Sequence, residues 1–183
     1  MSYKRWLLVA IFLFAGGLVL GLATSAGIEN LLSEDVAALE ELAELLAPLP
    51  QSSFLVMIFI KNVSALSISL VLSPIFCLVP VIALTFNGGL IGVVSAAVVQ
   101  QESLGYLLAG LLPHGIFELP ALIMGEAVAL SFGTAVMLAI FKKEKRNQLL
   151  TNVKSNLKYL GIAFALLLIA AIMETYVTPL FLS

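Results

Sequence analysis

Four ionisable residues lie in the middle of long apolar stretches of this sequence: Lys61, His114, Glu118 and Glu126. An ionisable group in a membrane-spanning helix costs about 2.5–3.5 kcal/mol on insertion scales, so we expect these side chains to face a bundle interior and to pair. His114 and Glu118 are four residues apart and share one helix face. Glu126, eight residues after Glu118, lies about 80° further round the helix. One broad face therefore holds all three, and Lys61 is the expected partner of either glutamate.

This polar cluster is open to three interpretations. It is a buried network that fixes helix register, or it lines a path for a proton, an ion or a solute. In the third interpretation His114, Glu118 and Glu126 bind a divalent metal such as zinc, which accepts histidine and carboxylate ligands. No other cofactor is predicted. The chain has one histidine and lacks the H-E-x-x-H pattern of metalloproteases, so we predict no catalytic residues and favour a protein that is not an enzyme.

The composition indicates which elements position these residues. Of the 183 residues, 61% are hydrophobic and 11% are charged, whereas a soluble domain has about 45–50% apolar and about 25% charged residues. These values exclude a soluble enzyme, a disordered tail and a nucleic-acid-binding protein. They predict an all-α fold, in which residues 1–183 form a single polytopic transmembrane helical bundle. Apolar runs long enough to cross a bilayer cover 6–26, 52–72, 75–99, about 114–141 and 160–180.

The stretch from residue 104 to residue 141 is too long for one simple span. We predict that Pro113 and Gly115 break it into a short helix over 104–112, re-entrant or broken, and a long span that follows. Pro120 frees a further backbone carbonyl one turn earlier. Such a break places His114 at the start of a helix.

The charged segments predict the orientation of the chain. Residues 29–50 carry acidic and no basic residues, with leucines at helical spacing, which predicts an acidic amphipathic helix outside the cytoplasm. Residues 142–158 are rich in lysine and arginine, so we predict a basic cytoplasmic loop there. Lys4 and Arg5 place the N-terminus on the same side. Five crossings then leave the C-terminus outside, in a multi-pass protein of the cell (plasma) membrane.

The third span is interrupted by a polar and glycine-rich stretch, Asn87, Gly88, Gly89 and Gly92. Glycines allow close approach of neighbouring helices, and this packing role is favoured over a substrate-binding broken helix of the transporter type. Small residues in spans also promote association. The expected partners are therefore the lipid bilayer, a second copy in a homo-oligomer, most commonly a dimer, and other membrane or envelope proteins, but not nucleic acid.

The segment 112–121, LPHGIFELPA, resembles the core motif of the stage II sporulation protein M (SpoIIM) family, which reads close to P-H-G-x-x-E-[LI]-P/x-A. The stretch 86–92, FNGGLIG, is similar to the family's N-G-x-x-x-G element. Members commonly show an asparagine pair where this chain has Lys61 and Asn62, so Asn62 matches and Lys61 departs. A small-residue-rich helix follows the core motif in the family, and it is matched here by Gly125, Ala127, Ala129 and Gly133.

The resemblance covers roughly residues 54–142 and implies an integral protein with about five spans. Founding members of the family act during engulfment in endospore-forming bacteria, where they hold a peptidoglycan-degrading complex at the septal membrane. The resemblance thus implies a non-enzymatic scaffold or a component of a membrane complex. A transporter or channel component with an intramembrane His/Glu/Lys site, and a metal-binding intramembrane site, are the alternatives.

Overall fold

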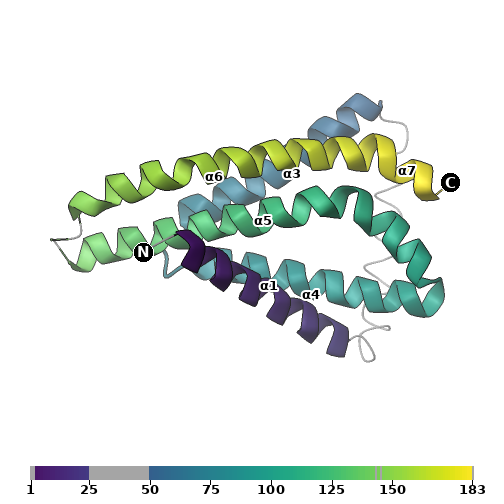
Figure 1. Cartoon of the computed structure of the whole chain (residues 1–183), viewed down its shortest axis with the longest axis horizontal. Helices are drawn as coiled ribbons and strands as arrows, with labels where there is room; N and C mark the ends of the chain where they lie inside the picture. The colour runs from purple at the N-terminus through teal and green to yellow at the C-terminus, as the bar shows by residue number, and fades with distance from the viewer. Residues whose placement is uncertain (1–2, 25–49, 143, 145, 183) are drawn as a thin grey trace.

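The computed structural model describes residues 3–24, 50–142, 144 and 146–182, which form a bundle of helices (Figure 1). No β-strand occurs in this part of the chain, and the predicted all-α fold class is confirmed. The last long helix continues through a π-helical turn, η3, into a short final helix. The elements in chain order are α1 (Tyr3–Thr24), α3 (Gln51–Leu72), α4 (Leu78–Gln101), α5 (Leu104–Phe141), α6 (Arg146–Ile172), η3 (Met173–Val177) and α7 (Thr178–Leu182).

Five candidate membrane spans are found among the described residues, as the sequence predicts. Four of them lie in α1, α3, α4 and the second part of α5, and the fifth, Val153–Phe181, runs through α6, η3 and α7. The prediction of a loop over 142–158 is wrong for most of that segment, because α6 already begins at Arg146. From Arg146 to Lys158 there is no proline or glycine, so nothing in this basic stretch stops a helix from extending out of the span.

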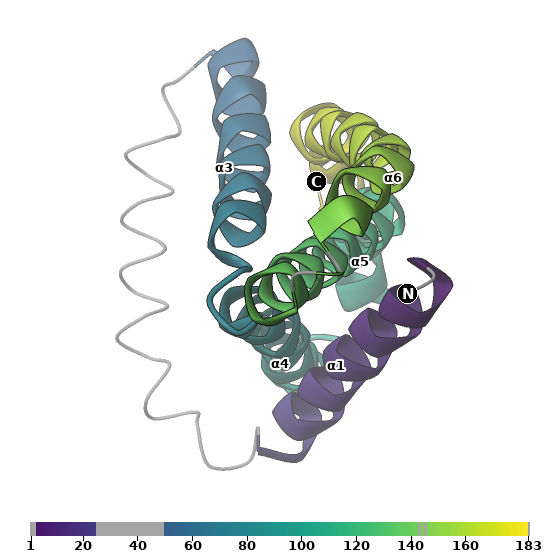
Figure 2. The same ribbon diagram turned by 90° about the vertical axis from the view of Figure 1, so that its left-hand side faces the viewer.

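The centre of the bundle is α5, which packs against α1, α3, α4 and α6. In Figure 2 these four helices surround it. More than half of its span Gly115–Phe141 is buried, whereas every other span is less than 30% buried. Small residues allow this close surrounding, since Ala121, Ala127 and Ala129 have no exposed surface at all. The residues on α5 therefore meet protein on most sides, and the other helices keep a face for lipid.

The predicted break in the long apolar stretch is a bend without unwinding. The backbone stays helical over Leu104–Phe141, with Pro113 and Pro120 inside the helix. Figure 1 shows α5 as a short leg and a long leg that meet at a sharp angle. Proline removes one backbone hydrogen bond and its ring clashes with the preceding turn, which bends a helix without ending it.

The predicted interruption of the third span does not occur, because α4 is helical throughout Leu78–Gln101. Its glycines instead lie against the backbone of α1. A Cβ atom placed on Gly88 would come within 2.2 Å of Phe14 O, and one placed on Gly92 would come within 2.4 Å of Leu18 O. On the α1 side, Gly17 and Gly21 meet Thr85 O and Gly89 O in the same way. The packing interpretation of these glycines agrees with this geometry.

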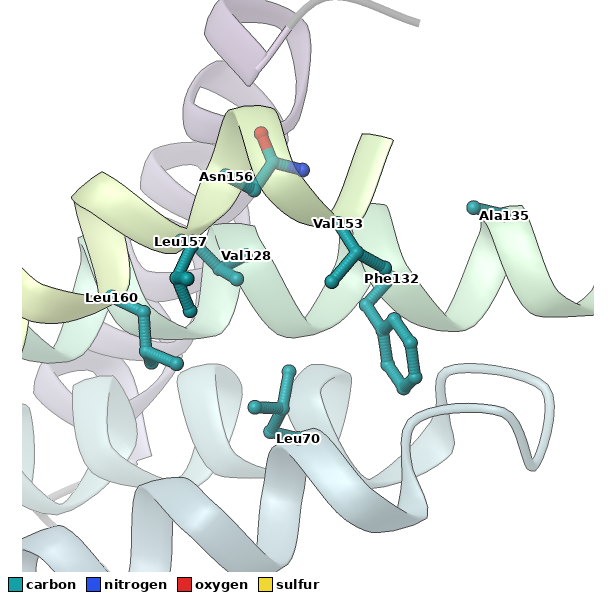
Figure 3. Close-up of a pocket in the computed structure, with 8 residues that line it drawn as sticks. All are labelled: Leu70, Val128, Phe132, Ala135, Val153, Asn156, Leu157 and Leu160. Carbon is teal, nitrogen blue, oxygen red and sulfur yellow. The ribbon is translucent and has the colours of Figure 1, made fainter. Parts of the chain in front are cut away.

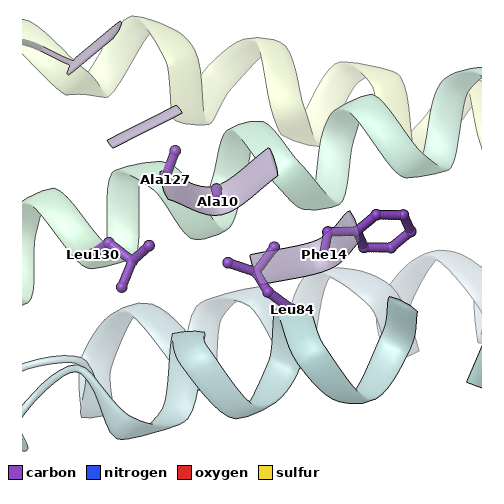
Figure 4. Close-up of a cluster of buried hydrophobic side chains, with 5 residues drawn as sticks. All are labelled: Ala10, Phe14, Leu84, Ala127 and Leu130. Atoms are coloured by element: carbon purple, nitrogen blue, oxygen red, sulfur yellow. The ribbon is translucent and has the colours of Figure 1, made fainter. Parts of the chain in front are cut away.

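An apolar cluster joins α1 and α4 to the central helix. It consists of Ala10, Phe14, Leu84, Ala127 and Leu130 (Figure 4). Leu84 is fully buried in it. The cluster and the glycine contacts together fix the position of α4, which contributes one wall of the site described below.

The ends of the helices gather at two ends of the bundle. The start of α1, the turn between α3 and α4, the end of α5 and the start of α6 lie on the left in Figure 1. The end of α7 and the link from α4 to α5 lie on the right. This arrangement is the one that five crossings require. The predicted acidic helix over 29–50, except for Pro50, lies outside the described residues, and which end faces the cytoplasm stays a prediction.

Candidate functional site

A polar cavity of about 190 Å³ lies inside the bundle between α3, α4 and α5. Five of the six residues predicted to form a polar centre line it, and they come from three different helices. The apolar part of the wall includes Leu167 of α6. The polar residues of the wall are Lys61, Asn62, Ser69, Asn87, Glu118 and Glu126.

The sixth predicted residue, His114, lies in α5 one turn before Glu118. Its side chain is outside the part of the chain that the structure describes. Any role of the imidazole, including metal binding, is therefore an expectation from the sequence.

Glu118 accepts a hydrogen bond from an amide of α3. Asn62 Nδ2 donates to Glu118 Oε1 at 3.2 Å, and both side chains are half-buried. Lys61 is exposed at the cavity wall, and among the described residues it forms no ion pair with Glu118 or Glu126. The predicted Lys61–glutamate pair is thus replaced by Asn62. Adjacent residues point about 100° apart on a helix, so α3 turns only one of the two toward Glu118.

Glu126 is bound more deeply than Glu118. Ser69 Oγ donates to Glu126 Oε2 at 2.5 Å, and both residues are only 1% exposed. Reasoning from the sequence missed Ser69, because a single serine in a span is common and carries no signal by itself. The spacing of the polar residues was the available signal. Ser69 follows Asn62 by seven residues, and Glu126 follows Glu118 by eight. On each helix the two polar residues are therefore about two turns apart and lie near the same face.

The two hydrogen bonds belong to a longer seam along which α3 and α5 run in the same direction. A Cβ atom on Gly125 would lie 2.4 Å from Leu66 Cδ2, between the two polar pairs. A Cβ atom on Gly133 would lie 2.3 Å from Ser73 O, beyond them. The glycines thus bring α3 close enough to α5 for its short polar side chains to reach the glutamates.

The third wall contributes an amide from α4. Asn87 Nδ2 donates to Ala83 O at 2.7 Å, which is a bond to its own helix. That bond uses the NH₂ group of the side chain, and the residue still lines the cavity. Asn87 therefore adds polarity to the wall beside an unbroken α4.

The chemistry of this site is that of an acidic chamber with one lysine at its wall. Carboxylate and amide oxygens bind hydrated or partly dehydrated cations, and carboxylates also accept protons. No three histidine, cysteine, aspartate or glutamate side chains converge for a metal ion among the described residues. The predicted metal set His114, Glu118 and Glu126 includes the one histidine whose side chain is not described, so it stays a prediction.

Comparison with known proteins places this chain in a family. The family model for "Stage II sporulation protein M" (SpoIIM) matches residues 7–179. An uncharacterized protein of Methanocaldococcus jannaschii is 32% identical to this chain over 123 residues, which are 67% of this chain and 69% of the relative. No solved structure is significantly similar to the chain.

Proposed function

The chain belongs to the stage II sporulation protein M family, and we propose that it carries a proton or a small cation through the cavity between α3, α4 and α5. In the part of the chain that the structure describes, five helices are long and apolar enough to cross a membrane. One observation carries the proposal: two glutamates from a membrane-spanning helix line one polar cavity of the bundle. Acidic residues at this depth are costly, and they commonly mark ion or proton paths.

The cavity itself distinguishes this proposal from a purely structural network. Protein interiors are close-packed, and voids larger than a water molecule are few. A water molecule takes up about 30 Å³ of liquid volume. The volume of about 190 Å³ leaves room for several water molecules beside the carboxylates. What favours a path over a network that only fixes helix register is that this space is lined by two carboxylates and two amides.

The two glutamates lie at different depths, as a path requires. Eight residues separate them along α5, which corresponds to about 12 Å of helix rise. Glu118 is half-buried and Glu126 is almost completely buried. In the proposed path Glu118 receives the cation or proton first, and Glu126, bound by Ser69, is the inner acceptor.

Reconstitution of the purified chain in liposomes tests this function. Under an imposed gradient of protons, sodium or potassium, the wild-type protein should move at least one of these ions. Glu118→Gln and Glu126→Gln should abolish that flux while helix content by circular dichroism is unchanged. Glu102→Gln is the matched control, because Glu102 is exposed at the end of α4, and it should leave the flux unchanged. Flux that survives in both cavity variants, or no flux with any of the three ions, would contradict the proposal.

The metal alternative is tested on the same preparation. Stoichiometric zinc or a similar divalent ion in the purified protein, lost in His114→Ala and in Glu118→Gln, would make the cavity a metal site. If no metal is retained and added zinc produces no thermal shift, the metal interpretation fails.

A second candidate is a non-enzymatic scaffold in a membrane complex, and the α3–α5 hydrogen bonds favour it. Buried carboxylates that are fully paired within a protein can fix helix register without passing an ion. If this is the function, affinity purification of the tagged chain should recover specific membrane or envelope proteins. Glu118→Gln and Glu126→Gln should then reduce that recovery only as far as they lower stability. The wild-type protein would show no flux.

A further inference from the structure

Lys61 is a charged residue in the middle of a membrane span. It lies ten residues after Gln51 and eleven before Leu72, the two ends of α3, so about 15 Å of helix separate it from either end. That distance exceeds the reach of its four-carbon side chain, and the ammonium cannot extend to the membrane–water interface as lysines near helix ends do. Charged side chains at such a depth almost always face the bundle interior or a water-filled cavity. The polar cavity, whose wall includes Lys61, provides these surroundings.

Lys61 stands at the open side of the polar cavity. It is exposed, whereas Asn62, Asn87 and Glu118 on the same wall are half-buried and Glu126 is buried. Asn62 donates to Glu118 Oε1, and in the described part of the chain Lys61 has no ion pair with either glutamate. Its positive charge is therefore not neutralised by direct contact with one carboxylate. It acts instead on any ion that enters the cavity.

The charges on the cavity wall nearly balance. Glu118 and Glu126 contribute two negative charges when both are ionised, and Lys61 contributes one positive charge. One proton or one monovalent cation brings this set to neutrality. A divalent cation would leave one positive charge without a partner, and an uncompensated charge in a protein interior is costly. The affinity of a protein site for divalent ions depends on the charge of its ligands, and here a lysine offsets one of the two carboxylates.

The other large cavity, between α3, α5 and α6, offers no competing cation site. Its volume is about 200 Å³, and its walls are almost entirely apolar, with Leu70 and Leu160 on opposite sides (Figure 3). No charged residue lines it in the part of the chain that the structure describes. Its polar wall residue, Asn156, donates to Ser131 Oγ at 2.8 Å. Cation binding inside the bundle therefore reports on the polar cavity.

We propose that Lys61 makes the polar cavity selective for protons and monovalent cations over divalent cations. The inference rests on the proposed function, because it names the ions that the same cavity accepts. At a given distance the ammonium repels a divalent ion twice as strongly as a monovalent ion. Since Lys61 stands at the open side of the cavity, it acts on the ion as the ion enters.

Binding of Mn²⁺ to the purified full chain, followed by the loss of the free-ion signal in electron paramagnetic resonance, tests this selectivity without a flux measurement. Lys61→Met should bind Mn²⁺ stoichiometrically and at least about tenfold more tightly than the wild-type protein. Adding Glu118→Gln to this variant should abolish the gain. Lys61→Gln removes the same charge and replaces Lys61→Met if that variant does not fold.

Two control variants separate the charge of Lys61 from its shape and from the total charge of the protein. Lys61→Arg keeps the positive charge and should bind Mn²⁺ no better than the wild-type protein. Lys4→Met removes an exposed lysine of α1 that does not line the cavity, and it should also bind no better.

The outcomes distinguish this inference from the proposed path. Tight Mn²⁺ binding by the wild-type protein, no gain in Lys61→Met, or an equal gain in Lys61→Arg would overturn the selectivity, even if liposomes show proton, sodium or potassium flux. A gain confined to the uncharged variants supports it, and Mn²⁺ should then reduce the flux of Lys61→Met at least about tenfold. If no ion moves in liposomes but Lys61→Met gains Mn²⁺ binding, the path fails, and Lys61 still decides which cations the cavity binds.

Discussion

Ser69 of α3 and Glu126 of α5 form a hydrogen bond at 2.5 Å, and each residue is only 1% exposed. Two turns away along the same pair of helices, Asn62 binds Glu118 at 3.2 Å. The two carboxylates of α5 are thus matched, one by one, with short polar side chains of α3. This correspondence makes α3 the helix that supplies a hydrogen-bond donor to each of the two glutamates.

Ser69→Ala should lower the free energy of unfolding by about 1–3 kcal/mol, because a buried acceptor on Glu126 loses its donor. Thermal unfolding of the purified protein in detergent measures this change. Ser64→Ala is the matched control, since Ser64 lies on the same helix and is exposed, and it should change stability by less than about 0.5 kcal/mol. Equal effects of the two substitutions would show that Glu126 does not depend on Ser69.

Asn62→Leu should destabilise the protein more than Lys61→Met does. The first substitution removes the donor to Glu118 and should cost about 1 kcal/mol, the usual net value of one hydrogen bond. The second changes an exposed residue with no ion pair to Glu118 in the described structure, and its effect should stay within about 0.5 kcal/mol. Chemical unfolding of both variants under one condition gives the comparison. If Lys61→Met destabilised the protein more than Asn62→Leu, Lys61 would be the partner of a glutamate, as the sequence suggests.

Gly17→Ala should separate α1 from α4. A Cβ atom at this position would lie 2.2 Å from Thr85 O, a backbone atom that cannot move aside by a rotamer change. We expect a loss of about 1–3 kcal/mol, the usual range for overpacking a close contact. The neighbouring Gly16 has nothing within 4 Å of such a Cβ, so Gly16→Ala should be neutral or stabilise the helix by about 0.5–1 kcal/mol. Thermal unfolding of the two variants side by side provides the measurement.

Phe76→Gly should stabilise the turn between α3 and α4. Phe76 and Cys77 both have positive φ angles, 51° and 54°, a conformation that costs an L-residue about 1–2 kcal/mol. Phe76 is 69% exposed, so the substitution removes little packing and should raise stability by about 1 kcal/mol. Ile75→Gly provides the contrast, because Ile75 has no positive φ and gains nothing from glycine. A destabilised Phe76→Gly would show that the side chain has a packing role that outweighs the backbone strain.

Cysteine labelling tests the predicted orientation. In a Cys77→Ser background, Lys142→Cys should react with an impermeant thiol reagent only from the cytoplasmic side, and Ser103→Cys only from the outside. Lys142 and Ser103 flank opposite ends of α5, which places them at opposite ends of the bundle. Labelling of both positions from one side would contradict the five-span topology. Reversed labelling would keep the five spans and invert the orientation.

The number and position of the spans followed from the sequence because they depend on local properties. A run of about 20 apolar residues is sufficient to cross a bilayer as a helix, whatever its neighbours are. The ionisable residues of the candidate site were visible for the same reason, since a glutamate such as Glu126 stands out in an apolar run. Proline was also informative, although Pro113 and Pro120 bend α5 and do not end it.

The partners of these residues were decided by the tertiary structure. Whether Lys61 or Asn62 faces Glu118 depends on the rotation of α3 about its axis, and the contacts of Gly125 with Leu66 and of Gly133 with Ser73 help to set that rotation. Ser69 gains its role only from the same contacts. The glycines of α4 gave an ambiguous local signal, because glycine can interrupt a helix or allow another helix to approach, and only the position of α1 decided between the two. The sequence by itself thus determined which side chains enter the membrane, and packing between helices determined which of them meet.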